Sequence, residues 1–423
     1  MNKKVLKRIG VILACLGLVS ACFSSRIEIK DNELVPTTVP LGYVPYPQDG
    51  YGDGPNQLGQ PDDVEILKDG RMVISDVYNN RIQVFDKDGK LVKSITHLEM
   101  GIESPEIVPA GVSKDGDGFV YVTLEGAGKI ARFNPDMDFV QFIGKPGQLT
   151  ADNYYDEENS GILMMPQGLI VSSQGDVFVI DMEQDVFRTK ERRSFRIRKF
   201  IPVKEKDEVI YQEDLDFARS QEITTVMNKS EGMALSEEAG LLFIAEEKAS
   251  SIQFGTGIKN PDKYRYIGVF DMQTGKFTGR LIGVTIVGGR MTNGYHTDSI
   301  EGLAVFEDYI FAVDEKQGKI YIYDIMSGSL LGDFGQAAYW YCDDHSDCVI
   351  DGINYNEQTI EAGIAKPHLL NDWRNNELAS PDGVSVETLN DGTRRLAVVD
   401  QWNSRILYYD LDALLAYFNL KIE

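Results

Sequence analysis

QPDDVEILKDGRMVISDVYNNRIQVFD, from Gln60 to Asp86, holds three short apolar strands joined by turns that contain Asp, Gly and Asn. These residue types favour tight turns, because Gly accepts positive φ and Asn and Asp bond to the turn backbone. Several units add a fourth strand, and such a unit buries both faces only against neighbours, as a propeller blade does. Five later segments repeat the pattern, beginning at Val108, Met165, Lys229, Asp298 and Ala379. The sequence therefore predicts an all-β protein, a six-bladed β-propeller with four-stranded blades.

The ends of the repeat region set the expected domain boundaries. The sixth unit lacks an obvious fourth strand, because DALLAYFNL, from Asp412, is typical of a helix. We therefore expect LGYVPYP, residues 41–47, to close the ring by pairing with the last blade. After its second strand the third unit runs on with mixed charge, which predicts a third strand and a surface insertion near residues 185–228. The propeller domain is expected over residues 41–423.

The start of the chain has the pattern of an export signal. A basic stretch precedes an apolar run that is short for a membrane span, and VSAC, residues 19–22, follows. This order resembles the lipobox of bacterial lipoproteins. The resemblance implies removal of residues 1–21, acylation of Cys22 and an anchored linker over residues 22–40. The alternative is an ordinary signal peptide with a chance cysteine.

The lipobox resemblance also implies a location. We expect the protein in the bacterial cell envelope, at the outer membrane in a Gram-negative cell, because Phe23 and not Asp follows the cysteine. The membrane partner is then reached through the lipid anchor, and we expect a monomer.

The chain is strongly acidic, with 66 Asp and Glu against 42 Lys and Arg and a formal net charge of −24. Residues 1–21 contain basic residues and no acid, so their removal makes the charge more negative. Such a surface repels nucleic acid and anionic headgroups, while it attracts divalent cations and cationic partners. We therefore expect no nucleic-acid partner.

Two cysteines remain as an isolated pair in WYCDDHSDCVID once Cys15 is removed and Cys22 is acylated. In an oxidising compartment Cys342 and Cys348 are expected to form a disulfide that closes a small loop. The histidine between them keeps a zinc site as the alternative, although no second ligand pair has metal-site spacing.

The first unit resembles an NHL repeat, over GDGPNQLGQPDDVEILKDGRMVISDVYNNRIQVFDKDGKLV from Gly52. In such blades the Asp that ends the second strand caps turn amides, and the Arg a few residues later bridges neighbouring blades. The resemblance implies this structural role for Asp76, Asn79, Asn80 and Arg81, and likewise for Asp400, Asn403 and Arg405.

Acidic residues recur at one position of the repeat. The first strand of each blade lines the channel of a propeller, so the residues just before these strands are expected at one mouth. Four of the six are acidic, and Glu246 and Glu247 add charge on the same side. Oxygen ligands without His or Cys suit Ca²⁺, so we predict a calcium site, with separately hydrated carboxylates as the alternative. The six positions are Asp62, Ala110, Gln167, Glu231, Glu301 and Asp382.

Three segments of the C-terminal half resemble the β-propeller phytases, in the same order. They are SEGMALSEEAGLLFIAEE, residues 230–247, DSIEGLAVF, residues 298–306, and SPDGVSVE, residues 380–387. In that family such acids hold calcium ions that, with basic side chains, bind phosphate and activate water. The resemblance implies calcium ligation by Glu231, Glu247, Glu301 and Asp382, and by Asp62 and Asp63, which are placed like the family's Asp-Asp pair.

The early blades depart from the phytases, which supply Lys, Arg and Tyr there to hold phosphate. The candidate replacements are Arg81, for which the structural role above is the alternative, Lys129 and Arg188. His296 lies near the expected mouth, with an exposed loop histidine as the alternative. The leading hypothesis is a calcium-dependent, phytase-like hydrolase of phosphate monoesters. The rival is a non-catalytic NHL-type propeller that binds a protein, peptide or glycan. A lactonase of the same fold is a third hypothesis, but such an enzyme requires Asn ligands in the channel, and the six mouth positions contain no Asn.

Overall fold

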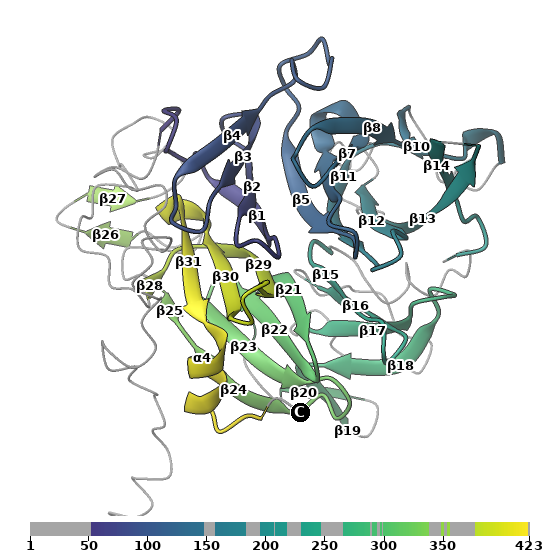
Figure 1. Cartoon of the computed structure of the whole chain (residues 1–423). Coiled ribbons are helices and arrows are strands. Elements are labelled where there is room, and N and C mark those ends of the chain that lie inside the picture. Colours follow the sequence, from purple (N-terminus) through teal and green to yellow (C-terminus); the bar gives the residue numbers. More distant parts are fainter. Residues whose placement is uncertain are drawn as a thin grey trace, which may run out of the picture.

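The protein is a six-bladed β-propeller, as the repeats predict (Figure 1). The computed structural model describes residues 52–147, 157–182, 195–206, 208–217, 230–246, 265–287, 290–293, 297, 299–337, 348–350, 353–355 and 377–421. Within these ranges five blades have four antiparallel strands and the sixth has three, paired in sequence order. Each first strand lies innermost, so six separate segments of the chain meet around one channel.

The first three blades follow the predicted order of strands. Blade 1 is β1 (Pro61–Ile66), β2 (Met72–Asp76), β3 (Arg81–Phe85) and β4 (Leu91–Ile95). Blade 2 is β5 (Pro109–Lys114), β6 (Val120–Leu124), β7 (Lys129–Phe133) and β8 (Phe139–Ile143). Blade 3 is β11 (Pro166–Val171), β12 (Val177–Met182), β13 (Phe195–Glu205) and β14 (Glu208–Glu213). The range 185–228, where an insertion was expected, thus supplies both outer strands of blade 3.

The other three blades complete the ring. Blade 4 is β15 (Met233–Ser236), β16 (Leu241–Ala245), β17 (Ile267–Asp271) and β18 (Phe277–Ile282). Blade 5 is β21 (Ile300–Phe306), β22 (Tyr309–Asp314), β23 (Lys319–Asp324) and β24 (Leu330–Phe334). Blade 6 is β29 (Pro381–Thr388), β30 (Arg394–Asp400) and β31 (Arg405–Asp410).

Short elements connect the blades. Four two-stranded pairs are β9 (Lys145–Pro146) with β10 (Ile162–Leu163), β19 (Val284–Val287) with β20 (Arg290–Asn293), β25 (Gln336–Ala337) with β28 (Glu377–Leu378), and β26 (Cys348–Ile350) with β27 (Ile353–Tyr355). The α-helix α4 (Leu411–Tyr417) follows the last strand. Among the described residues, no helix is long and apolar enough to span a membrane.

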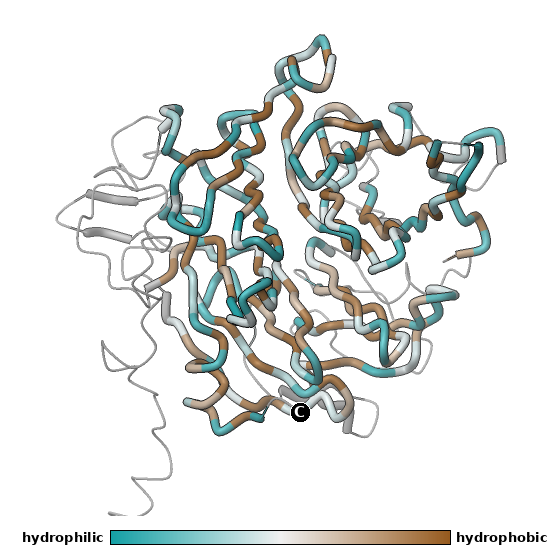
Figure 2. The backbone as a smooth tube through the Cα atoms, in the orientation of Figure 1, coloured by the Kyte–Doolittle hydropathy of each residue, from teal (hydrophilic) through white to brown (hydrophobic). Residues whose placement is uncertain are grey.

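The hydrophobic core lies between neighbouring blades. Six clusters of buried side chains each combine residues of two adjacent blades. Strand periodicity explains this, because successive side chains point to opposite faces of a sheet. In β2, Val73 packs toward blade 2 while Ile74 packs toward blade 6. Figure 2 accordingly shows hydrophobic residues concentrated in the strands and hydrophilic residues at the turns.

The first and last blades contact each other directly. The Ser385 hydroxyl of β29 accepts a hydrogen bond from the Ile66 N–H, 3.1 Å away, and donates one to Glu65 Oε1 at 3.1 Å. The helix predicted after β31 is present as α4, and its Leu411 and Leu414 join the core between blades 5 and 6. Residues 41–47, expected to close the ring, lie outside the described residues, so that prediction stays open.

The Asp, Asn and Arg residues of the repeat have structural roles, as the NHL resemblance implies. Asp76 accepts a hydrogen bond from the Gly59 N–H at 2.6 Å and pairs with Arg81 at 2.6 Å. Arg81 also donates to the carbonyls of Asp53, Gly54 and Gln57. The expected bridge by Arg81 to a neighbouring blade is thus a bond to the segment before its own blade.

The bridge between blades is made by the neighbouring asparagine. Asn80 Oδ1 accepts a hydrogen bond from the Val108 N–H, 3.1 Å away, at the entrance to blade 2. In blade 6, Asp400 pairs with Arg405 at 2.6 Å and accepts from Asn403 at 2.7 Å. All three of these blade 6 side chains are buried.

We predict that Asp400→Ala lowers the free energy of unfolding by about 3–5 kcal/mol, because it leaves the buried Arg405 cation without its partner. Unfolding in urea, followed by circular dichroism, measures the change. Asp412→Ala is the matched control, since its pair with Arg394 is exposed and should contribute little. Equal effects of the two substitutions would contradict the structural role of Asp400.

Candidate metal site at the channel mouth

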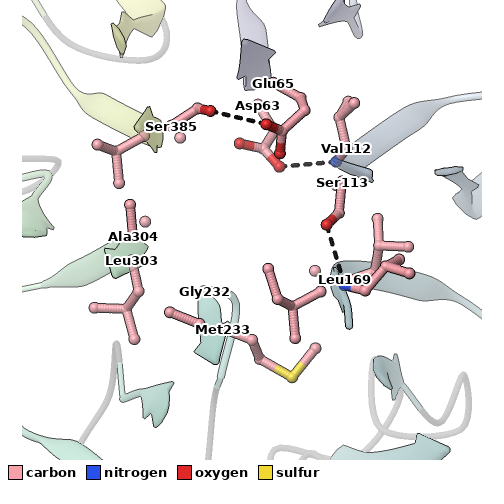
Figure 3. Close-up of a pocket in the computed structure, with 18 of the residues that line it drawn as sticks. Asp63, Glu65, Val112, Ser113, Leu169, Gly232, Met233, Leu303, Ala304 and Ser385 are labelled. Atoms are coloured by element: carbon pink, nitrogen blue, oxygen red, sulfur yellow. Dashed lines mark hydrogen bonds between the residues drawn. The ribbon is translucent and has the colours of Figure 1, made fainter. Parts of the chain in front are cut away.

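The six innermost strands surround a cavity of about 360 Å³ (Figure 3). Its lining runs from the starts of these strands, at the mouth, to their ends, at the opposite end of the channel. All six positions selected from the repeat line this one cavity: Asp62, Ala110, Gln167, Glu231, Glu301 and Asp382. The structure therefore brings together the four acids that the sequence placed at equivalent positions.

A β-bulge places these residues. We call the residue at the repeat position just listed the mouth residue of its blade. In five of the six blades, the pairing of the first strand with the second strand shifts register across the mouth residue and the residue after it. A bulge re-aims the side chain of the bulged strand, and such bulges are common beside functional sites. The bulge thus supplies a local cause for the common orientation of the mouth residues.

Glycine follows the mouth residue in every blade except the first, because the next blade approaches too closely for a side chain. A Cβ atom on Gly168 would lie 1.7 Å from the Glu231 carbonyl oxygen. One on Gly232 would lie 1.8 Å from the Glu301 carbonyl oxygen. Such distances exclude any side chain without backbone movement. Because glycine has no side chain, the neighbouring backbones can lie in contact here, and the mouth residues are therefore close to one another.

Blade 1 is the exception, since Asp63 stands where the other blades have glycine. Its carboxylate accepts hydrogen bonds from the Val64 and Val112 N–H groups, both at 2.8 Å, and Figure 3 shows the one from Val112. Burial raises the pKa of Asp63 to about 8. Asp63 was predicted as a calcium ligand, and here each of its oxygens already accepts a backbone hydrogen bond, one of them from blade 2.

Glu301 is the most enclosed acid of the mouth, with 4% of its surface exposed. Ser299 Oγ donates a hydrogen bond to its Oε1 at 3.1 Å, its buried Oε2 receives none from an N–H or hydroxyl group, and its carboxyl group is in hydrogen-bond contact with that of Glu231. Burial first, and then the charge of Glu231, raises the pKa of Glu301 well above its usual range. An ionised Glu301 therefore lacks a counter-charge within the described protein.

Asp382 lies in a similar environment. Gln401 Nε2 donates a hydrogen bond to Asp382 Oδ2 at 3.0 Å. Burial raises the pKa of Asp382 well above its usual range, and the charges of Asp62 and Glu231 raise it further. The carboxylates of blades 1, 4 and 6 thus act on one another across the channel.

Two further acids near the mouth were not predicted from the sequence, although they follow second strands as Glu246 does in blade 4. They are Glu125 in blade 2, which lines the channel, and Glu315 in blade 5. Burial raises the pKa of Glu125, a hydrogen bond from Gln167 opposes this, and Glu231 adds to it. Glu315 accepts a hydrogen bond from Ser380 Oγ at 2.9 Å, and its charge raises the pKa of Asp382. The sequence feature that could have identified these two residues is the recurrence of Glu directly after the second strand of a blade.

The opposite end of the channel is neutralised by the protein itself. Lys114 of blade 2 forms ion pairs with Glu65 of blade 1 and, at 2.9 Å, with Glu387 of blade 6. Burial raises the pKa of Glu65, and the Lys114 ammonium opposes that rise. Among the described residues, the cations that line the channel are Lys68 and Lys114, both at this end.

The remaining predicted residues do not meet at the mouth within the described structure. Lys129 lies outside the channel lining, with its ammonium 4.3 Å from the centre of the Phe142 ring. Several predictions concern residues that the structure does not describe: Cys22, Arg188, Glu247, His296 and Cys342. The Cys348 side chain is likewise undescribed, so the predicted disulfide stays a prediction.

The donor set fits a divalent cation. Within the described ranges, no group of three or more His, Cys, Asp or Glu side chains is arranged so that it could hold a metal ion as it stands. Yet two buried oxygens that line the channel, Gln167 Oε1 and Glu301 Oε2, receive no hydrogen bond from a described N–H or hydroxyl group. Buried acceptors without partners are costly, and a cation would satisfy them. Because the donors are oxygens alone, Ca²⁺ suits them better than zinc or copper.

Comparison with known proteins gives only distant likenesses. No protein family profile and no curated protein matches the chain. A gluconolactonase from Xanthomonas campestris is 12% identical, covers 84% of this chain and 86% of its own, and superposes with a TM-score of 0.48. The calcium-binding protein regucalcin from Agrobacterium tumefaciens is 9% identical over 82% of this chain and 83% of its own, with a TM-score of 0.43.

A streptogramin B lyase is similar to the same degree, at 12% identity over 85% of this chain and 96% of its own, with a TM-score of 0.42. These three proteins are described as a gluconolactonase, a calcium-binding protein and a lyase. Identities of 9–12% and TM-scores below 0.5 leave the function of this chain to be argued from its own residues.

We predict that Glu301→Gln raises the melting temperature at pH 8 in the presence of a chelator. The folded protein holds the Glu301 proton more tightly than the unfolded chain does, so this group lowers stability as pH rises above its ordinary pKa of 4.5. The gain should therefore shrink at pH 5. Glu238→Gln, on an exposed turn, is the control and should change little at either pH. A variant that melts lower than the parent at both pH values would contradict the electrostatic account.

Proposed function

We propose that this chain is an exported calcium-binding β-propeller, and that the ion at the channel mouth serves the hydrolysis of phosphate monoesters. The observation that carries the proposal is the ring of four acids around one cavity, without a described Lys or Arg at that end. Like charges that line one cavity repel one another, so they need a counter-charge, which here has to come from outside the chain. The acidic net charge of the protein would draw divalent cations toward the mouth.

Three carboxylates would hold the ion, those of Glu231, Glu301 and Asp382. Ser299 and Gln401 orient two of them through the hydrogen bonds at 3.1 and 3.0 Å. Asp62 of blade 1 lies in the same lining and adds negative charge, and Asp63 lies beside it. A bound calcium ion would supply positive charge that polarises a substrate oxygen or a coordinated water molecule. The acids then act as ligands and not as general bases.

One observation favours the non-catalytic alternative, a calcium-binding module for a protein, peptide or glycan. The phytase-like chemistry uses basic side chains to stabilise phosphate, and Lys129 lies outside the channel lining. Without basic side chains at the mouth, the metal ion alone would have to stabilise the charge of a phosphoryl transition state. Arg188 and His296, the other candidates, lie outside the described residues.

Export and lipidation belong to the same proposal. The pattern of residues 1–22 supports acylation at Cys22 and anchorage in the bacterial cell envelope. Calcium is far more abundant outside cells than in the cytosol, and extracellular modules bind it with dissociation constants of about 10⁻⁴–10⁻³ M. A modest affinity would therefore suffice for a mouth that faces outward.

Calcium should raise the thermal stability of the purified chain. At a calcium concentration of about 100 times the dissociation constant, the expected gain is about 2.7 kcal/mol. The measurement is the melting temperature during a calcium titration, with magnesium in a parallel series. Glu231→Gln should abolish the gain, whereas Glu238→Gln should keep it. A melting temperature that does not change with calcium concentration would exclude the calcium site at the channel mouth.

Catalysis is tested separately with p-nitrophenyl phosphate, in calcium and in excess chelator. The proposal predicts hydrolysis that requires calcium and that Glu231→Gln removes. Stabilisation by calcium without hydrolysis would exclude the phosphomonoesterase and leave the binding module.

A further inference from the structure

A second cavity, of about 460 Å³, adjoins the channel mouth between blades 2 and 3. It shares Val108 and Glu125 with the channel, so the two hollows meet at these residues. Both volumes lie in the range of about 300–1,000 Å³ that is usual for small-molecule sites. We call this cavity the side chamber, and define it by Val108, Ala127, Pro146, Leu163, Met164 and Met165.

The side chains that line the side chamber are mostly alkyl or thioether groups, whereas the channel mouth has four acidic side chains. Glu125, at the junction with the channel, is the one ionisable residue in its described lining. The rest of the lining consists of alkyl and thioether side chains and glycine backbone. Methionine side chains adapt their shape to apolar groups and make favourable contacts with aromatic rings. The chamber thus offers apolar side chains to a ligand, while its polar groups are those of the backbone and of Glu125.

The walls of the side chamber are held in place from beneath. Asp181 Oδ1 accepts hydrogen bonds from the N–H groups of Met164 and Met165, at 2.9 and 3.0 Å. Asp181 is itself paired with the buried Arg198, 3.3 Å away. On the other side, the Lys145 N–H donates to the Gly161 carbonyl at 2.8 Å, beside the pairing of β9 with β10. The cavity is therefore preformed, which lowers the entropy that binding must overcome.

Two polar side chains stand where the chamber joins the channel. The Gln167 side chain hydrogen bonds with the Glu125 carboxylate, across the boundary between blades 2 and 3. A ligand that spans this junction would have one end among apolar groups and the other at the acidic mouth. The two ends must therefore differ in chemistry.

We propose that the side chamber binds the compact apolar group of a ligand, such as an aromatic ring, while the anionic group of that ligand reaches the cation at the mouth. The anionic half of this inference rests on the proposed function, and the apolar half rests on the chamber alone. The substrate class is then the phosphate monoester of a small apolar alcohol or phenol. A densely charged polyphosphate such as phytate would leave the chamber unused.

Two phosphonates test the inference, because they resemble phosphate monoesters and resist hydrolysis. Phenylphosphonate and methylphosphonate are titrated into the full chain in calcium, with isothermal titration calorimetry as the readout. Burial of the ring should make phenylphosphonate bind roughly 10-fold more tightly or better. Equal dissociation constants would overturn the inference.

Two substitutions link the preference to the chamber. Ala127→Leu fills part of the cavity and should reduce the preference for the phenyl compound, while binding of methylphosphonate stays unchanged. Met165→Ala enlarges the cavity and should keep methylphosphonate binding while altering the phenyl preference. Ala239→Leu, on an exposed turn at the other end of the channel, is the control and should change neither. A cooperative melting transition in excess chelator, close to that of the parent, verifies that each variant is folded.

A calcium-free arm separates this inference from the proposed function. Benzyl alcohol, observed by ligand-detected NMR in excess chelator, should contact the parent protein and lose contact in Ala127→Leu. That result without any effect of calcium would support the chamber and exclude the cation site. A calcium effect without binding of benzyl alcohol and without a phenyl preference would support the cation site and overturn the chamber.

Discussion

The close approach of the six innermost strands is the constraint on which the rest of the structure depends. Glycine after the mouth residue lets each backbone lie against the next blade, where a Cβ on Gly232 would be 1.8 Å from a carbonyl oxygen. The bulge at the same place re-aims the preceding side chain. Acids on different blades, far apart in sequence, therefore share one cavity whose volume is about 360 Å³.

The two ends of the channel differ in how their buried negative charge is compensated. At one end Lys114 pairs with Glu65 and Glu387, so three blades are joined by an internal counter-charge. At the mouth, burial and mutual repulsion raise the pKa values of Glu301 and Asp382. Buried charges are stable only when they are paired or bound to a cation. This contrast, within one molecule, is the physical basis for the calcium proposal.

The repeat predicted the number of blades, the order of strands and the mouth positions, because strand periodicity and turn residues are local. It did not single out Glu125 and Glu315, although Glu recurs after the second strand, since their distance from the mouth depends on how each second strand turns back toward the channel. Nor could it reveal the side chamber, which forms where β9 and β10 pair between blades. The pairing of Lys114 with Glu387 was equally hidden, because it joins residues of blades 2 and 6.

A crystal soaked with terbium, which substitutes for calcium and scatters anomalously, tests the central claim most directly. The account predicts an anomalous peak in the channel mouth, with oxygens of Glu231 and Glu301 at about 2.3–2.6 Å. A strong peak at this place would establish the mouth as a cation site. Full terbium loading elsewhere on the protein, with the mouth occupied by water alone, would contradict it.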